Sequence, residues 1–600
     1  MGTKKLYPSI DYTSRDFNSI KNDLVNYAKR YYPDTFRDFN EAGFGALMLD
    51  TVSYVGDILS YYVDYSANET FLDTAVEYDN VLKLGRQMGF RFTGNPSSFG
   101  IVMFYIVVPA SITGLGPDTN YIPILKRGTT LSSDTGGMFI LNEDVIFSNS
   151  KNEVVVSAAN ETTGVPTHFA IKATGQVISG EIREETIDVG DFEKFRRIEL
   201  GDENITEVLG CFDASGHEYF KVDYLSQDVV FKSITNRNTL SNDKAASLLK
   251  PVVVPRRFTV ERERLKTFLQ FGFGSERDVS ADPLIDPATS VLDFHARNYV
   301  TETSFDPTNL LGTDKLGVSP ANTSLRVIYR VNTNDNVNVS SDGLTSVTNP
   351  DFQFGNINSL NSATVVAVQN SVEVSNEDPI LGDVTLPTTS ELKTRIYDTF
   401  ANQNRAVTSQ DYKSLAYQMP TEFGALKRIN VLRDSDSRKR NLNLYVILED
   451  NNGHLETTNL TVKENLKTWL NRHRMINDTI DILDAKIANI RITFTIVADL
   501  ESNKYEVLNE ANLTIGKFYL NKLEIGEPLF ITDIYSTLNA IPGVVDTTQV
   551  SVLRVSGGLY STLSFDIDAA TSPDGRFISV PGNVILELKY PSDDVRGSVL

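Results

Sequence analysis

Residues 43–65 read GFGALMLDTVSYVGDILSYYVDY, and this stretch decides how the amino-terminal part of the chain is organised. Its polar side chains recur at intervals of three and four residues, which on a helix places them in one narrow stripe. Nearly all its other residues are apolar or aromatic, so the pattern predicts a helix roughly 33 Å long that is apolar around most of its circumference. The stripe comprises Asp50, Ser53, Asp57, Ser60 and Asp64.

Such a helix must be covered on several sides, and its cover could come from three environments. A membrane span is disfavoured, because each of the three aspartates would cost a few kcal/mol in the bilayer. Burial within its own domain is one alternative. A bundle with helices of other chains is favoured, because the region before Phe99 is too small to wrap the helix alone.

Helices are also predicted on both sides of this stretch. Apolar residues recur at helical spacing from Phe17 to Tyr31. A further helix is expected over Glu69–Met88, with Gly89 ending it. Residues 1–98 are therefore predicted to form an N-terminal helical region that contributes to a core bundle.

From Phe99 the pattern changes to short runs rich in β-branched and aromatic residues, separated by Gly, Pro, Asn and Asp. Such runs are typical of strands, so residues 99–335 are predicted to form a mainly β domain. Residues 336–386 carry much Asn, Ser, Thr and Asp, and a loop-rich linker or surface excursion is expected there. The predicted strands include Ile101–Val108, Ala170–Ile178, Phe268–Phe273 and Ser324–Val331.

Helical and strand patterns alternate through residues 387–556, which predicts α+β domains whose sheets are covered by helices. Thr408 and Asp411 form a candidate capping pair. Residues 557–600 return to strand patterns and are predicted to form a C-terminal β tail. The fold class is therefore multidomain α+β: an N-terminal helical region, a central mainly-β domain, and C-terminal α+β domains with a β tail. The predicted C-terminal helices are Ser390–Phe400, Ser409–Gln418, Val462–His473, Tyr505–Leu520 and Ile531–Ile541.

Composition excludes several classes of function. The chain has 600 residues, a formal net charge of −22 and a single cysteine, Cys211. The negative charge opposes binding to a phosphate backbone, so no nucleic-acid partner is predicted. One cysteine excludes an intrachain disulfide framework and a thiolate metal cluster within the chain. Met1–Asp11 is polar and is followed by no apolar run, so we expect neither a signal peptide nor membrane insertion.

Motifs that carry enzyme chemistry are sparse. The five histidines stand apart from one another, so no short-range zinc motif exists. Phe271–Gly274 (FGFG) lacks the third glycine of a dinucleotide fingerprint, because Arg277 takes that position, and a strand followed by a turn is expected instead. We therefore predict no catalytic residues, no cofactor and no metal site, and a protein that is not an enzyme.

Five segments, taken in their order along the chain, carry a family resemblance. The most specific is Arg405–Tyr412 (RAVTSQDY), followed by Phe423–Ala425 (FGA). Together the segments resemble the inner-baseplate wedge subunit of T-even-type contractile-tailed phages, and more loosely the J-like baseplate proteins of other contractile machines. The remaining segments are Phe39–Phe90, Ile122–Thr129 (IPILKRGT), Phe271–Gly274 and Ile541–Val544 (IPGV).

The resemblance implies a structural protein of the virion tail baseplate that is assembled in the cytoplasm of the host bacterium. Its partners would be a second copy of itself, a long helical wedge subunit and other wedge subunits, and the tail hub or sheath-initiating subunit. Phe44–Tyr65 would join a trimeric core bundle. Residues 387–556 would pair within the wedge and link neighbouring wedges into a ring that rearranges to trigger sheath contraction. The resemblance is weaker around Thr333–Pro387 and after Gly557.

The predicted partner contacts lie on the apolar side of the Phe44–Tyr65 helix. Its three aspartates are expected to face solvent or to fix the helix register against a basic partner, because burying unpaired carboxylates would be prohibitive. A virion adhesin or glycan-binding tail protein is the alternative function, and a tail-associated glycan hydrolase is a third. The residues predicted to bind partner helices are Phe44, Leu47, Met48, Val52, Val55, Leu59 and Tyr62.

Overall fold

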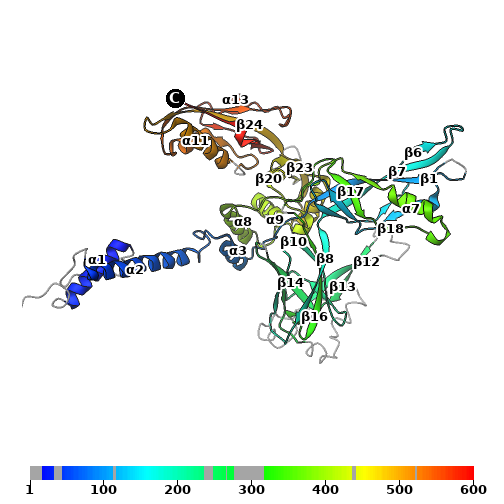
Figure 1. Ribbon diagram of the computed structural model, residues 1–600, viewed down its shortest axis with the longest axis horizontal. Coiled ribbons are helices and arrows are strands. Elements are labelled where there is room, and N and C mark those ends of the chain that lie inside the picture. The colour runs from blue at the N-terminus through cyan, green and yellow to red at the C-terminus, as the bar shows by residue number, and fades with distance from the viewer. Residues whose placement is uncertain are drawn as a thin grey trace, which may run out of the picture. The chain divides into compact units, whose positions relative to one another are not determined.

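A computed structural model of the chain describes residues 16–32, 43–112, 116–235, 247–264, 266–275, 316–334, 336–434, 441–519 and 523–600. The described elements confirm the predicted fold class, with helices in the amino-terminal part, mainly strands in the centre, and both in the carboxyl-terminal part (Figure 1). The chain divides into two compact units, Met1–Arg91 with Pro387–Phe400, and Phe92–Leu386 with Ala401–Leu600. All sheets formed by the described residues belong to the second unit.

The first unit is helical. α1 (Phe17–Tyr31) begins after Asp16, whose side chain accepts a hydrogen bond from the backbone N–H of Ser19 at 3.2 Å. This bond satisfies one of the N–H groups that the first turn of a helix leaves free. α2 (Phe44–Asn68) contains the predicted apolar helix and continues beyond it to Asn68.

α3 (Tyr78–Gln87) begins later than the predicted helix Glu69–Met88. The carboxylate of Glu69 accepts a hydrogen bond from the backbone N–H of Val76 at 2.8 Å, which holds the intervening residues in a turn. A side chain that bonds to the nearby backbone in this way competes with helix formation. The helix ends before Gly89 as predicted, and the φ of +90° at Gly89 is one that glycine adopts without strain.

α8 (Thr389–Asn402) brings a distant part of the chain to α3 within the first unit. A Cβ added to Gly85 of α3 would lie 2.7 Å from Cδ1 of Ile396, so this close approach requires glycine. The ammonium group of Lys393 donates a hydrogen bond to the carbonyl oxygen of Asp73 at 2.8 Å, across 320 residues of sequence. The first unit is therefore held together by contacts that local sequence patterns do not reveal.

The first sheet of the second unit is built on β1 (Phe99–Pro109), which pairs antiparallel with β7 (Pro166–Ser179) along its length. The strand order is β17-β3-β4-β7-β1-β19, and β6 also pairs with β7. Buried side chains of these strands form one apolar core. The other strands are β3 (Thr130–Ser133), β4 (Met138–Leu141), β6 (Glu153–Ala159), β17 (Leu344–Asn349) and β19 (Glu373–Ser375), and a small sheet holds β2 (Ile124–Leu125), β5 (Val145–Ile146) and β18 (Phe352–Gln353).

Residues 336–386 contribute elements to this domain, whereas the sequence predicts a linker or surface excursion there. β17 pairs with β3, β19 pairs with β1, and α7 (Ser362–Asn370) packs against β1. Val365, Val368 and Ile380 lie in the apolar core. β17 and β19, the two ends of the strand order, also lie near each other, and the side-chain oxygen of Asn376 accepts a hydrogen bond from the backbone N–H of Leu344 at 2.9 Å.

The second sheet has the strand order β8-β16-β10-β11-β14-β15-β9 and a separate apolar core. Phe271–Gly274 is the strand end and turn that the sequence predicts. A Cβ on Gly272 would lie 2.1 Å from the carbonyl oxygen of Gly317, so the backbone there leaves no room for a side chain. The strands are β8 (Glu181–Val189), β9 (Arg197–Glu199), β10 (Ile205–Asp213), β11 (Glu218–Lys221), β14 (Arg257–Arg262), β15 (Thr267–Phe271) and β16 (Thr323–Val331), and β12 (Val229–Thr235) and β13 (Ser247–Val253) form a separate hairpin.

The first C-terminal α+β domain begins with the predicted capping pair. The carboxylate of Asp411 accepts from the backbone N–H of Thr408 at 2.8 Å, and the N–H of Asp411 donates to the Thr408 hydroxyl at 3.2 Å. This capping box starts α9 (Ser409–Tyr417), which shares an apolar core with α10 (Leu460–Asn471) and a four-stranded sheet. The strands are β20 (Arg428–Arg433), β21 (Asn441–Glu449), β22 (Leu455–Glu456) and β23 (Thr479–Asp484).

The last sheet is centred on β24 (Lys486–Ala498), which pairs antiparallel with β26 (Val544–Arg554). Residues 557–600 supply β28 (Val584–Glu587) and β29 (Val595–Val599), and both run parallel to β24. The predicted β tail is therefore integrated into the sheet that the preceding residues build. α11 (Lys504–Tyr519) and α12 (Ile531–Asn539) pack into the same core, and the short elements are β25 (Leu529–Phe530), α13 (Ile567–Ala570), β27 (Phe577–Ile578) and α14 (Pro591–Asp594).

Candidate functional site

The side of α2 that faces α1 is small and polar. Ser53 and Ala46 are the buried residues of α2. A Cβ added to Gly56 would lie 3.3 Å from Cδ1 of Ile20, so α1 approaches this side of α2 closely. The apolar remainder of the α2 circumference is consequently directed away from α1.

The polar stripe does have a basic partner, and it belongs to the same chain. The ammonium group of Lys21 on α1 lies 2.6 Å from Oδ1 of Asp50 on α2. Both side chains are partly exposed, so the pair contributes about 0–1 kcal/mol at most. Its larger effect is on geometry, because it sets the register of α1 against α2.

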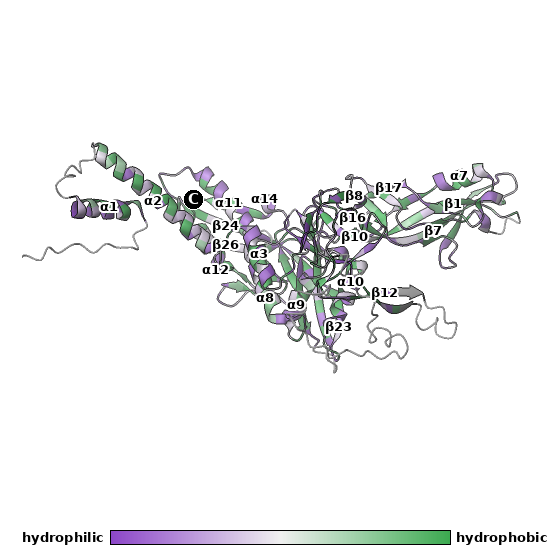
Figure 2. Ribbon diagram, turned by 90° about the horizontal axis from the view of Figure 1, so that it is seen from below, coloured by the Kyte–Doolittle hydropathy of each residue, from purple (hydrophilic) through white to green (hydrophobic). Residues whose placement is uncertain are grey.

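All seven residues predicted to bind partner helices lie on the open side of α2, and each is at least 49% exposed. Figure 2 shows hydrophobic colour along much of this helix. An exposed apolar surface of this kind marks an interaction site in soluble proteins. Binding of partner helices by these residues stays a prediction. The same surface includes Tyr54, Tyr61 and Val63, which the predicted set omitted although the apolar pattern surrounds the helix.

A groove runs between α1 and α2 beside this surface. Its volume is about 500 Å³ and its lining is mostly apolar. A groove of this composition suits the apolar face of another helix. It is lined by Leu24, Ala28, Tyr32, Phe44, Gly45, Met48, Leu49 and Val52.

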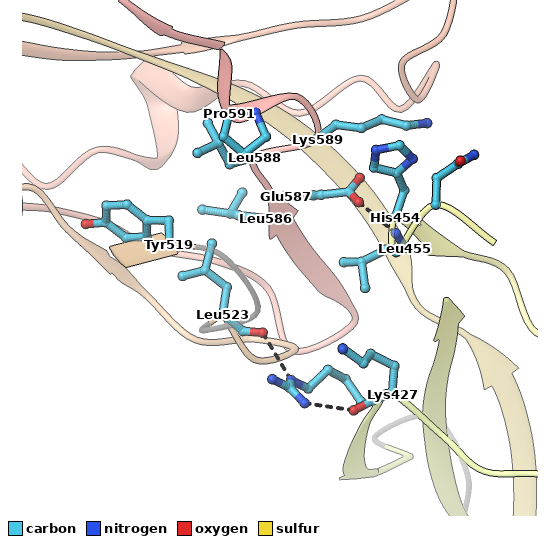
Figure 3. Close-up of a pocket in the computed structure, with 13 residues that line it drawn as sticks. Lys427, His454, Leu455, Tyr519, Leu523, Leu586, Glu587, Leu588, Lys589 and Pro591 are labelled. Atoms are coloured by element: carbon cyan, nitrogen blue, oxygen red, sulfur yellow. Dashed lines mark hydrogen bonds between the residues drawn. The ribbon is translucent and has the colours of Figure 1, made fainter. Parts of the chain in front are cut away.

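A second pocket, of about 180 Å³, lies where the last sheet meets the preceding α+β domain (Figure 3). The carboxylate of Glu587 points into the joint, and its two oxygens accept hydrogen bonds from the backbone N–H of Leu455 and the side chain of Asn489, both at 2.7 Å. Burial raises the pKa of Glu587, although both hydrogen bonds act in the opposite direction. Glu587 therefore connects β28 to β22 and β24.

The cationic side chains of this pocket are already paired within the protein. Lys427 lies 2.9 Å from Glu449, and Arg428 lies 2.9 Å from Glu524. The third basic side chain of the lining, Lys589, donates a hydrogen bond to the carbonyl oxygen of Leu559 at 2.8 Å, so all three serve contacts within the protein.

Within the described ranges, no group of three or more His, Cys, Asp or Glu side chains could hold a metal ion. His217 and His454 each pair with a single carboxylate, that of Asp213 at 2.9 Å and that of Asp450 at 3.3 Å. His295 lies outside the described residues. Of the helices that the structure describes, none is both long enough and apolar enough to cross a membrane.

Residues 16–87, which span α1 to α3, match the family model described as "Bacteriophage baseplate protein, N-terminal domain". This match supports a structural role for the chain in a baseplate. The matched residues are a small part of the chain, and they include the whole apolar surface of α2. No curated protein matches the chain.

Two solved baseplate structures are similar to the chain at 9% identity. One is the anti-feeding prophage baseplate, 6-fold symmetrised, with a TM-score of 0.24 and 98% of each chain covered. The other is the type VI secretion system TssK-TssF-TssG baseplate subcomplex, with a TM-score of 0.24, covering 73% of this chain and 95% of that chain. Scores this low do not establish a shared fold.

Proposed function

We propose that this chain is a structural, non-enzymatic wedge subunit of a contractile-tail baseplate, and that α2 joins a bundle with helices of other chains. One observation carries the proposal: the seven predicted bundle residues are each at least 49% exposed, within the segment that matches the baseplate N-terminal domain. A chain that folded for itself alone would bury such a surface, because apolar burial contributes about 25 cal/mol per Å².

The cover of α2 has to come from several directions. α1 packs closely near Gly56 and borders one apolar groove beside α2, and the exposed apolar residues leave much of the remaining circumference uncovered. A long helical wedge subunit lying in the groove, together with a second copy of this chain, would enclose it. Obligate interfaces of this kind commonly bury on the order of 2,000 Å² or more.

Residues 387–556 would pair with the second copy and connect neighbouring wedges into a ring around the tail hub. Contacts that switch need two arrangements that are close in free energy, so these interfaces would be weaker than the helical bundle. The subunit would be assembled in the host cytoplasm and act in the virion tail, where rearrangement of the ring triggers sheath contraction. Residues 1–98 would then be the bundle region, and 99–335 the mainly-β domain.

Co-expression with the neighbouring tail genes, followed by mass measurement of the purified complex, tests this proposal. The wild-type chain is expected to co-purify in a complex with other tail subunits. Leu59→Asp is expected to prevent this, because assembly would bury a carboxylate without a partner at a cost of several kcal/mol.

The matched control is Val165→Asp, at a similarly exposed apolar position next to β7. This variant is expected to assemble like the wild type, since Val165 lies outside the proposed bundle. Normal assembly of the Leu59→Asp protein would refute the bundle role.

The alternative function, glycan binding by a tail protein, needs an exposed aromatic cleft. The pocket of Figure 3 is lined by one phenolic ring, that of Tyr519, so it does not favour this alternative. The third candidate function is a tail-associated glycan hydrolase. It is tested by incubating the protein with host envelope and measuring the sugars released. Sugar release would contradict a purely structural role.

A further inference from the structure

Among the strands that the structure describes, none extends the β12–β13 hairpin into a larger sheet. Its seven pairs run in unbroken antiparallel register from Val229↔Val253 to Thr235↔Ser247, and no further described strand pairs with either one. An isolated two-stranded sheet is marginally stable in water and needs a third strand or a covering element. The hairpin is therefore a surface that another segment can complete.

The backbone directions of the hairpin follow from a single hydrogen bond. The N–H of Val254 donates to the carbonyl oxygen of Asp228 at 2.8 Å, which makes these two residues a hydrogen-bonded pair in the same register. Hydrogen-bonded and non-hydrogen-bonded pairs alternate along antiparallel strands. Val229 therefore directs its backbone N–H and C=O away from β13. The next residue of β12 that does so is Phe231.

The two edges of the hairpin are not equivalent. Pro251 stands opposite Phe231 and occupies an outward-facing position on the β13 edge. Because proline has no N–H, it blunts that edge against an added strand. The β12 edge has no proline, and Phe231 presents both a donor and an acceptor there. Strand addition is consequently possible at β12 and opposed at β13.

The two faces of the hairpin also differ. Phe231, Leu249 and Val253 share one face, and they are 63%, 69% and 56% exposed. The opposite face carries Lys232 directly across from Lys250. Lys232 is held by Glu218 at 3.1 Å, whereas an excess positive charge remains at Lys250. One face therefore attracts apolar side chains and the other attracts a carboxylate.

The chain protects a comparable edge elsewhere. β8 is the outermost strand of its sheet, and charged side chains occupy five of its nine positions. Such charges discourage the addition of a strand from another molecule. The β12 edge has a single charged residue among its seven, so the same protection is missing there.

We propose that the free edge of β12 accepts an extended strand from a different protein, with apolar side chains toward Phe231 and Leu249 and a carboxylate toward Lys232 and Lys250. A second copy of β12 fits less well. Antiparallel self-pairing would bring two further lysines to a face that already holds two, and like charges on neighbouring strands are destabilising. This inference goes beyond the proposed baseplate role and does not depend on α2.

The test uses the full chain and a labelled heptapeptide in which Val and Asp alternate, with a Val–Lys peptide as the matched probe. Fluorescence anisotropy is expected to show binding of the Asp peptide at least about fivefold tighter than of the Lys peptide, because a carboxylate attracts and an ammonium group repels Lys232 on the adjacent strand, with Lys250 adding to both effects from β13. Phe231→Asp is expected to abolish binding. Ile182→Asp, at an exposed position of β8, is the control and is expected to leave it unchanged.

Lys250→Glu provides a second variant should Phe231→Asp disturb the hairpin, and it is expected to reverse the preference between the two peptides. Hydrogen exchange of the isolated chain distinguishes the possible occupants. Fast exchange at the Phe231 amide that slows with the Asp peptide supports the proposal. The proposal would be overturned by slow exchange of the Phe231 amide without peptide, or by equal affinity for both peptides. A dimer of the chain that Phe231→Asp dissociates would also overturn it.

Discussion

At the scale of single residues, burial decides what an ionisable group can do. Cys211 on β10 is fully buried, and burial raises the pKa of its thiol to about 12. Glu587 is also buried, and its carboxylate accepts one hydrogen bond from the preceding domain and one from within its own sheet. Neither group is available for reaction with a substrate, which agrees with a structural role.

Cys211 should be inert in the folded protein. Only the thiolate is nucleophilic, and a thiol with so high a pKa stays protonated at pH 8. Treatment with iodoacetamide is expected to leave the native chain unmodified and to add one group after unfolding in urea, as measured by intact mass. Rapid alkylation of the folded chain would show that β10 opens.

Glu587 should make stability depend on pH in a definite direction. Burial raises its folded-state pKa above the ordinary value of 4.5, so its favourable contribution is complete below about pH 4.5 and is lost as pH rises through the folded-state pKa. The stability of the wild type relative to Glu587→Gln is therefore expected to decrease between pH 4.5 and pH 7. Urea unfolding of both proteins across this range measures the change, and a constant difference would contradict it.

At the scale of elements, α2 exposes the side that an ordinary surface helix buries. Its small and polar stripe contacts α1, and its apolar residues face outward. A helix of a monomeric protein normally turns its apolar stripe to the core. The close contact around Gly56 and the ion pair of Lys21 with Asp50 join this side of α2 to α1.

Gly56→Leu should separate α1 from α2. A leucine at this position would overlap Ile20, and overpacking of this kind commonly costs about 1–3 kcal/mol. Faster hydrogen exchange in α1 is the expected result. Val63→Leu, at an exposed position of α2 outside the groove that α1 borders, is the control and should leave α1 unchanged. Equal exchange in both variants would show that α1 does not pack on α2.

At the scale of the whole molecule, buried arginine joins distant segments of the second unit. Arg262 on β14 donates hydrogen bonds to the carbonyl oxygens of Thr93 and Thr206 and to the hydroxyl of Thr421. Burial lowers its pKa to about 10, so it remains charged at neutral pH. One side chain thus connects the segment before β1, strand β10 and the first C-terminal domain.

Arg262→Met should loosen all three connections together. The variant removes the Arg262 donors from the carbonyl oxygens of Thr93 and Thr206, although Thr206 keeps the hydroxyl of Thr421 as a donor, and the expected loss of stability is about 2–4 kcal/mol. Arg326→Met is the control, because Arg326 forms an exposed pair with Glu184 and an exposed contact with the ring of Phe212, and its loss should cost less than about 1 kcal/mol. Urea unfolding compares the two. A similar small loss in both would mean that Arg262 does not hold the segments.

Local patterns along the chain were sufficient to predict most of the elements, whereas the partner-binding role of the seven α2 residues stays a prediction. All five predicted C-terminal helices are present, with bounds that differ by at most two residues, and the Thr408–Asp411 cap forms as expected. The apolar helix predicted over Phe44–Tyr65 is also present and continues three residues further, to Asn68. Side-chain direction repeats with the helix or strand period, so a sequence carries this information within a few residues.

Tertiary structure alone decided which element meets which. Nothing near Asp50 indicates that its partner is Lys21 of the same chain, and nothing in residues 336–386 or 557–600 indicates pairing with β1, β3 and β24. The sequence of β12 likewise does not indicate that it is an edge strand. This follows from the described sheet, in which β12 pairs with β13 alone. Such contacts join residues far apart in sequence, and local periodicity specifies the faces of an element without specifying what covers them.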